Sequence, residues 1–142
     1  MSKLTIFRGL PGSGKTTMAR KLAAQTGAIL IEPDALMVQD GIYQYSPERY
    51  QEACFQCEAI IEMLTACDNP LDDGSVLVPD IIYADVLPRR IDVQSIIDLY
   101  VTRPNVEVID CMITPKESLR RNRHNVRQED IKRMAEQWED WV

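Results

Sequence analysis

The chain has 142 residues, which suits one ordinary domain and is too short for two comfortable ones. Apolar residues make up 45% and charged residues 27%, a balance typical of a folded globular domain rather than a disordered chain. The 16 Lys and Arg against 22 Asp and Glu give a net charge of −6, which argues against broad duplex DNA binding because such binding needs a basic surface.

The sequence contains no sign of a membrane span or an export signal. No apolar run approaches the length of about 18 residues that a span requires, so we expect no membrane partner. The first residues are interrupted by Arg8 too early for a secretory signal. Four cysteines are too few for a secreted disulfide framework, so we expect free thiols and a cytoplasmic location.

Short runs rich in Val, Ile and Leu alternate with longer stretches of helical period along the chain. Buried strands are expected at residues 4–7, 28–31, 76–78 and 106–113. Amphipathic helices are expected around residues 18–23, 53–64, 93–101 and 131–142. Strands separated by helices need crossover connections, so the pattern predicts a single α/β domain over residues 1–142, with helices on both faces of a mainly parallel sheet of four to five strands.

Two helix starts and two loops are marked by local signals. Ser46-Pro47 and Thr114-Pro115 each place a capping hydroxyl before a proline, and Glu117 completes a capping box in the second. Loops are expected at residues 40–41 and 68–74, where Asp, Asn, Gly and Pro gather.

The segment from Gly9 to Thr16 matches G-x-x-x-x-G-K-[ST] in full. Its glycines let the backbone turn so that successive N–H groups point at phosphate oxygens, and the following helix adds the positive end of its dipole. Lys15 would reach the β- and γ-phosphates, and the Thr16 hydroxyl would bind Mg²⁺. A glycine-rich surface turn is the plain alternative, but an apolar strand precedes the loop and an amphipathic helix follows. We therefore expect ATP and Mg²⁺ to bind at Gly9, Pro11, Gly12, Ser13, Gly14, Lys15, Thr16 and Thr17.

A carboxylate follows the second expected strand. Asp34 comes where parallel sheets present functional groups, at the carboxyl ends of their strands. A carboxylate there can accept the proton of an attacking hydroxyl, as phosphoryl transfer to an alcohol requires. The same residue equally fits a helix cap or a solvated turn aspartate after Pro33.

Four arginines gather around the single histidine of this acidic chain. Planar guanidinium groups suit the equatorial oxygens of a phosphoryl group in transfer, and a mobile lid over residues 120–128 would close on ATP and exclude water. A solvated helix face that pairs with nearby acids is the alternative. The cluster comprises Arg120, Arg121, Arg123 and Arg127, with His124 among them.

These motifs together resemble the P-loop kinases grouped with phage polynucleotide kinase, and most of all the AAA-type kinase domain of NEDD4-binding protein 2 and its relatives. The resemblance rests on residues 8–17, Asp34, residues 40–43, and a tail with Arg-Asn-x-His followed by a helix ending in Trp-Glu. It implies transfer of the ATP γ-phosphate to a hydroxyl, often the 5′-hydroxyl of a polynucleotide. By the same match Lys15 and Thr16 bind phosphate and Mg²⁺, Asp34 is the base, and Arg121 and Arg123 are catalytic lid arginines.

The sequence departs from this family on the acceptor side. The family carries Asp-Thr-Asn or a similar run after its third strand, whereas this chain has Asp80, which keeps the acidic metal-binding role unless the alignment shifts to Asp85. Met37 stands where polynucleotide kinases carry an arginine, and Asn125 where the lid motif has glycine. The acceptor is therefore a nucleic-acid end, a nucleotide or a small hydroxylated metabolite. The alternatives are a kinase of nucleotide sugars related to the zeta toxins, or an interaction protein that binds ATP without transferring phosphate.

Two smaller features, a pair of cysteines and a group of tyrosines, each have a functional and a structural interpretation. Cys54 and Cys57 lie on one apolar helix face, which favours buried, inert thiols over a metal or redox site. The tyrosines at positions 43, 45 and 50 suit either the stacking of an acceptor base or ordinary packing.

Overall fold

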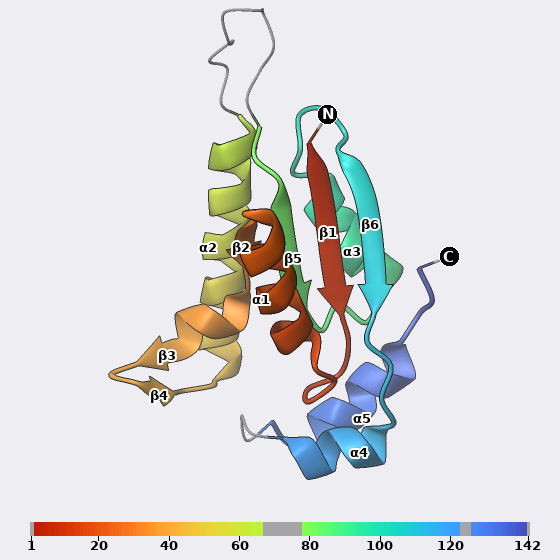
Figure 1. The fold of residues 1–142 in the computed structure, drawn as a ribbon. Coiled ribbons are helices and arrows are strands. Elements are labelled where there is room, and N and C mark those ends of the chain that lie inside the picture. The colour runs from red at the N-terminus through yellow and green to blue at the C-terminus, as the bar shows by residue number, and fades with distance from the viewer. Residues whose placement is uncertain (1, 67–77, 123–125, 142) are drawn as a thin grey trace, which may run out of the picture.

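The computed structural model describes residues 2–66, 78–122 and 126–141 and has a fully parallel four-stranded sheet at its centre (Figure 1). The strands are β1 (Lys3–Arg8), β2 (Ile29–Ile31), β5 (Ile81–Asp85) and β6 (Asn105–Asp110). Their order is β2-β5-β1-β6, with Leu4 paired to Ile81 on one side and to Val106 on the other. The parallel sheet predicted from the alternating pattern is confirmed.

The third strand lies later in the chain than expected. The sequence favoured a strand at 76–78, but β5 begins at Ile81, and Val78 lies ahead of it. Pro79 cannot donate a hydrogen bond to a ladder, so it separates Val78 from the strand proper. All five residues of β5 are buried, as expected for a central strand covered on both faces. Residues 76 and 77 lie outside the described residues. The last strand also ends at Asp110, three residues short of the expected Ile113.

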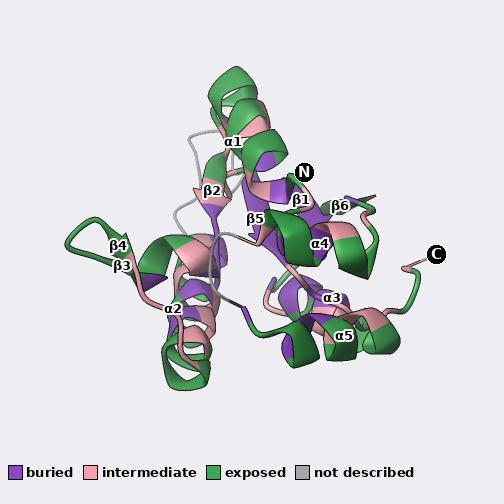
Figure 2. Cartoon of the chain, turned by 90° about the horizontal axis from the view of Figure 1, so that it is seen from below, coloured by how far each residue is buried: buried purple, intermediate pink, exposed green. Residues whose placement is uncertain are grey.

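Helices cover both faces of the sheet and make a three-layer structure (Figure 2). Helix α1 (Lys15–Thr26) packs on the face that carries Phe7 and Ile82. Helices α2 (Pro47–Thr65) and α3 (Arg90–Ile97) pack on the opposite face. The larger core cluster lies between that face and these two helices, with Leu4, Ile6, Ile61, Tyr83, Val93 and Ile96 among its buried members.

Both predicted helix starts are confirmed. The Ser46 hydroxyl accepts the Arg49 N–H at 3.1 Å, and the Thr114 hydroxyl accepts the Glu117 N–H at 3.1 Å at the start of α4 (Pro115–Arg121). The expected loop at 40–41 is the turn of a small hairpin formed by β3 (Val38–Gln39) and β4 (Ile42–Tyr43), which follows the 3-10 helix η1 (Pro33–Met37). The expected loop at 68–74 lies outside the described residues.

The last two helices lie at the carboxyl edge of the sheet, where they flank the loop after β1 (Figure 1). Helix α5 (Gln128–Gln137) ends five residues before the expected position 142. Beyond it the chain binds the segment after β5, where the Glu139 N–H donates to the Pro88 carbonyl at 2.8 Å. Within the described residues, no helix is both long and apolar enough to cross a membrane.

Candidate functional site

The loop between β1 and α1 has the backbone that its glycines predict. Gly12 and Gly14 have φ angles of 79° and 88°, a left-handed conformation that residues with a Cβ rarely adopt. The Ser13 N–H donates to the Leu10 carbonyl at 3.1 Å, which closes the turn just before the helix starts at Lys15. The unpaired N–H groups of the first turn of α1 therefore face the same side as the loop, which is the arrangement that binds anions.

Neighbouring elements hold this loop tightly. The Ser118 hydroxyl of α4 is fully buried and donates to the Pro11 carbonyl at 2.5 Å. A Cβ at Gly12 would lie 2.8 Å from the Cβ of Arg121, also on α4. A Cβ at Gly9 would lie 2.6 Å from the Cys111 carbonyl. The loop is therefore seated directly against α4 and the end of β6, with no room for side chains at these glycines.

A cavity of about 810 Å³ opens beside the loop. It collects groups from the carboxyl edge of the sheet, from α1, from the η1–hairpin segment, from α2, from the end of α4 and from Met134 of α5. Its polar lining residues are Lys15, Thr16, Thr17, Arg20, Glu32, Asp34, Tyr43, Tyr45, Tyr50, Asp85, Arg120, Arg121 and Asn122. The phosphate-binding loop and the candidate base therefore share one cavity.

Asp34 lies in that cavity as the second residue of η1. The cap of η1 is Glu32, not Asp34, so the capping interpretation of Asp34 does not describe its place. Its carboxylate accepts a hydrogen bond from the Tyr43 hydroxyl of the hairpin at 3.0 Å. Burial, with a further contribution from the Asp34 carboxylate, raises the pKa of Tyr43 well above its ordinary value, which keeps the hydroxyl protonated and donating.

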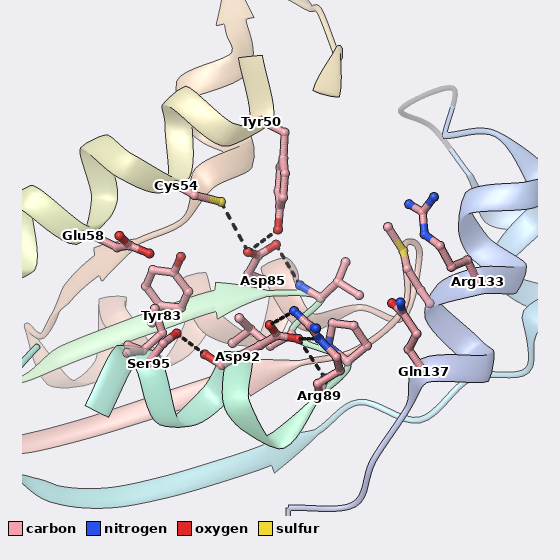
Figure 3. Close-up of a pocket in the computed structure, with 15 residues that line it drawn as sticks. Tyr50, Cys54, Glu58, Tyr83, Asp85, Arg89, Asp92, Ser95, Arg133 and Gln137 are labelled. Atoms are coloured by element: carbon pink, nitrogen blue, oxygen red, sulfur yellow. Dashed lines mark hydrogen bonds and ion pairs between the residues drawn. The ribbon is translucent and has the colours of Figure 1, made fainter. Parts of the chain in front are cut away.

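Asp85, at the end of β5, is a buried carboxylate that lines this cavity and also the smaller neighbouring one drawn in Figure 3. It accepts hydrogen bonds from the Tyr50 hydroxyl at 2.6 Å and from the Val86 N–H at 2.8 Å. Burial raises its pKa to about 6, although both hydrogen bonds act in the opposite direction. The Cys54 thiol lies 4.0 Å from the same carboxylate.

Asp80, the position that the family comparison favoured for the metal, lies elsewhere. It precedes β5 at the amino edge of the sheet, where its carboxylate accepts the Lys3 N–H at 2.8 Å. The structure does not bring it to the cavity, and Asp85 occupies the place that the sequence pattern assigned to Asp80. The cause is that the third strand begins at Ile81, five residues later than the expected residue 76.

The arginine cluster divides between the cavity and the protein surface. Arg120 and Arg121 line the cavity, and both bind Glu117 on the previous turn of α4, with the Arg121 Nε 2.7 Å from its carboxylate. The exposed side chain of Arg127 binds the buried carboxylate of Asp130 at 3.2 Å, which agrees with the predicted pairing to nearby acids. Arg123 and His124 lie outside the described residues.

The side-chain oxygens that line the cavity suit Mg²⁺ only if phosphate oxygens complete its coordination. Thr16, Asp34 and Asp85 offer the hard oxygen donors that Mg²⁺ prefers. Within the described ranges, no three His, Cys, Asp or Glu side chains come close enough to hold a metal ion by themselves. The residues therefore fit an ion that arrives bound to a nucleotide.

Sequence reasoning missed Glu32 and Arg20. Glu32 lies between β2 and η1, at the N-cap position but without a capping hydrogen bond from its side chain, which is only 6% exposed. Its Oε1 accepts Nε and Nη2 of Arg20 at 3.3 and 3.2 Å, while Oε2 is buried and has no hydrogen-bond partner among the described residues. A carboxylate directly after a strand was the available signal, and Asp34, two residues later, carries the same signal.

A second cavity of about 300 Å³ adjoins Asp85 on its far side (Figure 3). It shares Tyr50, Asp85, Val86 and Met134 with the larger one and extends between α2, α3 and α5. Figure 3 shows Arg89 paired with Asp92 on its floor, where the Arg89 Nη2 lies 2.9 Å from the Asp92 carboxylate.

The sheet order and the loop after β1 define the class of fold: the chain has the three-layer α/β fold of P-loop NTPases. Residues 4–69 match a family model described as AAA domain. A chain of the Pnkp1/Rnl/Hen1 RNA repair complex is 19% identical, with a TM-score of 0.68 over 96% of this chain and 43% of that one. A gluconokinase from Sinorhizobium meliloti 1021 is 13% identical, with a TM-score of 0.61 over 98% of this chain and 75% of that one.

The AvrRxo1-ORF1:-ORF2 complex with ATP also contains a similar chain, 22% identical, with a TM-score of 0.56 over 84% of this chain and 39% of that one. The chain thus spans less than half the length of its counterparts in the RNA repair complex and the AvrRxo1 complex. These likenesses establish the fold. They also show that a domain of this shape occurs both within larger proteins and as most of a gluconokinase chain.

Proposed function

We propose that this chain is a kinase that transfers the γ-phosphate of Mg²⁺-ATP to a hydroxyl acceptor. The observation that carries the proposal is the placement of Asp34 in the same cavity as Lys15 and the loop at Gly12 and Gly14. A triphosphate on the loop would present its terminal phosphate toward the carboxylates at the ends of β2 and β5. The kinases among the structural neighbours support the same activity.

On the donor side, the loop backbone and the first turn of α1 bind the phosphates, and Lys15 offsets their charge. Lys15 is only 6% exposed, so its ammonium acts from a fixed position with little screening by water. Thr16 and Asp85 would hold Mg²⁺, which when bound neutralises charge on the phosphate oxygens. Arg121, and Arg123 from the adjacent segment, would stabilise the phosphoryl group during transfer.

On the acceptor side, Asp34 would take the proton of the attacking hydroxyl. The Tyr43 hydroxyl, 3.0 Å away, fixes the orientation of this carboxylate. A hydroxyl that stays protonated keeps donating to this carboxylate, so the candidate base is held in place beside the loop. The acceptor would then approach from the side of the hairpin and of Tyr45 and Tyr50.

The resemblance to polynucleotide kinases makes a 5′-hydroxyl polynucleotide one acceptor to test, and the zeta-toxin relationship makes a nucleotide sugar another. A protein that binds ATP only to regulate an interaction is the non-enzymatic alternative. Its support is the run Val86-Leu87-Pro88 after Asp85, which supplies no side-chain hydroxyl or amide to hold an acceptor.

The test is incubation of the purified chain with γ-labelled ATP, Mg²⁺ and a panel of 5′-hydroxyl oligonucleotides, nucleotides, nucleotide sugars, neutral sugars and amino sugars. We expect one class to be labelled by the wild type and to lose the label with Lys15→Ala and with Asp34→Asn. Calorimetry with ATP should show that Asp34→Asn still binds the nucleotide. ATP binding with no labelled acceptor in any class would support the non-enzymatic alternative instead.

A further inference from the structure

Two arginines at the end of α4 line the large cavity, and one carboxylate holds them in different ways. Glu117, one turn earlier, accepts both Nε and Nη2 of Arg120, with that Nε 2.9 Å from its Oε2. It accepts Arg121 through Nε alone, 2.7 Å from its Oε1. Within the part of the chain that the structure describes, neither Nη atom of Arg121 has a hydrogen-bond partner. The outer end of the Arg121 guanidinium can therefore bind a ligand in the cavity.

The backbone of Arg121 is fixed relative to the phosphate-binding loop. Ser118, three residues earlier on α4, donates its buried hydroxyl to the Pro11 carbonyl at 2.5 Å. A Cβ at Gly12 would lie 2.8 Å from the Cβ of Arg121 itself. Residues three apart share one face of a helix, so these two contacts set that face of α4 against the loop. They leave the side-chain torsions of Arg121 free, and the hydrogen bond to Glu117 restricts those torsions.

The charges of the three side chains leave a cation at the loop. Two guanidinium groups share one carboxylate, so the group as a whole carries one positive charge. Hydrogen bonds from Arg120, together with the charges of Arg120 and Arg121, lower the pKa of Glu117 to about 2, so its carboxylate is ionised at neutral pH. Arg120 binds both carboxylate oxygens, which is the stronger arrangement. Arg120 therefore neutralises most of the Glu117 charge, and Arg121 keeps its own.

Glu117 has two opposing effects on an anion at the loop. Its negative charge repels the anion, and its hydrogen bond orients the arginine that attracts it. The side chains of Glu117, Arg120 and Arg121 are 31%, 70% and 53% exposed, so water and salt weaken the repulsion. A ligand that must immobilise a free arginine side chain loses about threefold to tenfold in affinity. We therefore expect the orienting effect of Glu117 to outweigh the repulsion.

We propose that Glu117 is a positioning residue that holds Arg121 toward the terminal phosphate of a nucleotide on the loop. The proposal rests on the proposed binding of ATP and adds a residue that has no contact with the nucleotide itself. The contacts at Pro11 and Gly12 place the backbone of Arg121, and Glu117 places its guanidinium. The protein thus presents this cation to the phosphate through its own contacts.

Calorimetric titration with Mg²⁺-ATP and with Mg²⁺-ADP tests the proposal. In Glu117→Ala we expect the Kd for ATP to rise about threefold to tenfold, because Arg121 loses its orienting partner. The Kd for ADP should stay within about twofold, because ADP lacks the terminal phosphate. Glu117→Gln keeps an oxygen that can accept the Arg121 Nε, so its Kd for ATP should stay within about twofold of wild type.

A double-mutant cycle identifies the residue through which Glu117 acts. In an Arg121→Ala background, adding Glu117→Ala should cause no further loss of ATP affinity. Glu129→Ala is the matched control, since it removes an exposed carboxylate from the first turn of α5 and lines neither cavity. It should leave both Kd values unchanged. Urea unfolding should show every variant folded, because exposed ion pairs contribute little to stability.

The outcomes separate this inference from the kinase proposal. Tighter ATP binding in both Glu117→Ala and Glu117→Gln would overturn the inference, since Glu117 would then act by repulsion alone. Equal losses for ATP and ADP, or a loss that persists in the Arg121→Ala background, would also overturn it. The expected coupling without any labelled acceptor would support the inference and remove only the kinase proposal. Failure of the wild type to bind Mg²⁺-ATP would overturn both.

Discussion

The guanidinium of Arg8 lies over the indole ring of Trp138, with its Cζ 4.0 Å from the ring centroid. Arg8 is the last residue of β1, is fully buried, and directly precedes the phosphate-binding loop. It also donates to the Leu87 and Glu139 carbonyls at 3.0 and 2.7 Å. One side chain thus joins the start of the loop, the segment after β5 and the end of the described chain.

The first prediction concerns this junction. Arg8→Met keeps most of the side-chain volume but leaves one buried and two partly buried carbonyls without this donor, so we expect a loss of about 3 kcal/mol in the free energy of unfolding. Urea unfolding followed by tryptophan fluorescence measures it. Arg103→Met, at an exposed position, is the control and should stay within about 0.5 kcal/mol of wild type. A loss below about 1 kcal/mol in Arg8→Met would show that water replaces these contacts.

The second prediction separates backbone strain from the function of the loop. Gly12 and Gly27 have nearly the same φ, 79° and 76°, but only at Gly12 would a Cβ meet a neighbour, 2.8 Å from Arg121. Alanine at either position should cost about 1 kcal/mol of stability from the left-handed backbone. Only Gly12→Ala should also weaken ATP binding, by about tenfold or more, because α4 or the loop must move.

Calorimetric titration of both variants with Mg²⁺-ATP checks this. Gly27→Ala serves as the control for strain, because nothing lies within 4 Å of its added Cβ. Equal ATP affinity in the two variants would mean that the loop tolerates displacement from α4. The close contact between the loop and Arg121 would then not matter for ATP binding.

Some of these features could be predicted from the sequence and others could not. The loop at residues 9–16 and the caps at Ser46 and Thr114 were predictable because each depends on a few consecutive residues. The third strand was misplaced because its pairing with β1 and β2 is a long-range property that a short apolar run does not report.

The roles of Arg8 and Glu32 were out of reach for the same reason. Arg8 contacts segments about 80 and 130 residues away, and nothing local distinguishes it from an exposed arginine. The burial of Glu32 depends on Arg20, twelve residues earlier on another layer of the fold. Asp34 could be predicted because its position after a strand is a local signal. Glu32 follows the same strand, but the local signal does not distinguish the two.

The third prediction is a pH dependence that comes from Asp85. Burial raises its pKa from the ordinary 3.8 to about 6, so the folded state binds a proton more tightly than the unfolded state between these values. Its contribution is therefore most favourable below pH 4 and is lost as pH rises through about 6. Relative to Asp85→Asn, wild type should lose about 2 to 3 kcal/mol between pH 4 and pH 8.

Urea unfolding at intervals across this range, in magnesium-free buffer with chelator, measures the difference. Tyr50→Phe is the companion variant: it removes a donor that stabilises the charged carboxylate, so the loss should move to higher pH. Asp40→Asn in the exposed hairpin turn reports the effect of removing a surface charge alone. A difference between wild type and Asp85→Asn that stays constant from pH 4 to pH 8 would contradict the assignment.

The last prediction concerns the thiols on α2. Cys54 and Cys57 are free and face the core side of the helix beside Asp85, and burial raises the pKa of each to about 12. Since the thiolate is the reactive form, both should react with a disulfide reagent at pH 8 at least about a hundredfold more slowly in the folded protein than in concentrated guanidinium chloride. A Cys67→Ser background confines the signal to the three described cysteines, and absorbance at the wavelength of the released thiol follows it. Labelling of either α2 cysteine within seconds in the folded state would show that α2 opens readily, and the environment described for Asp85 would then be transient rather than fixed.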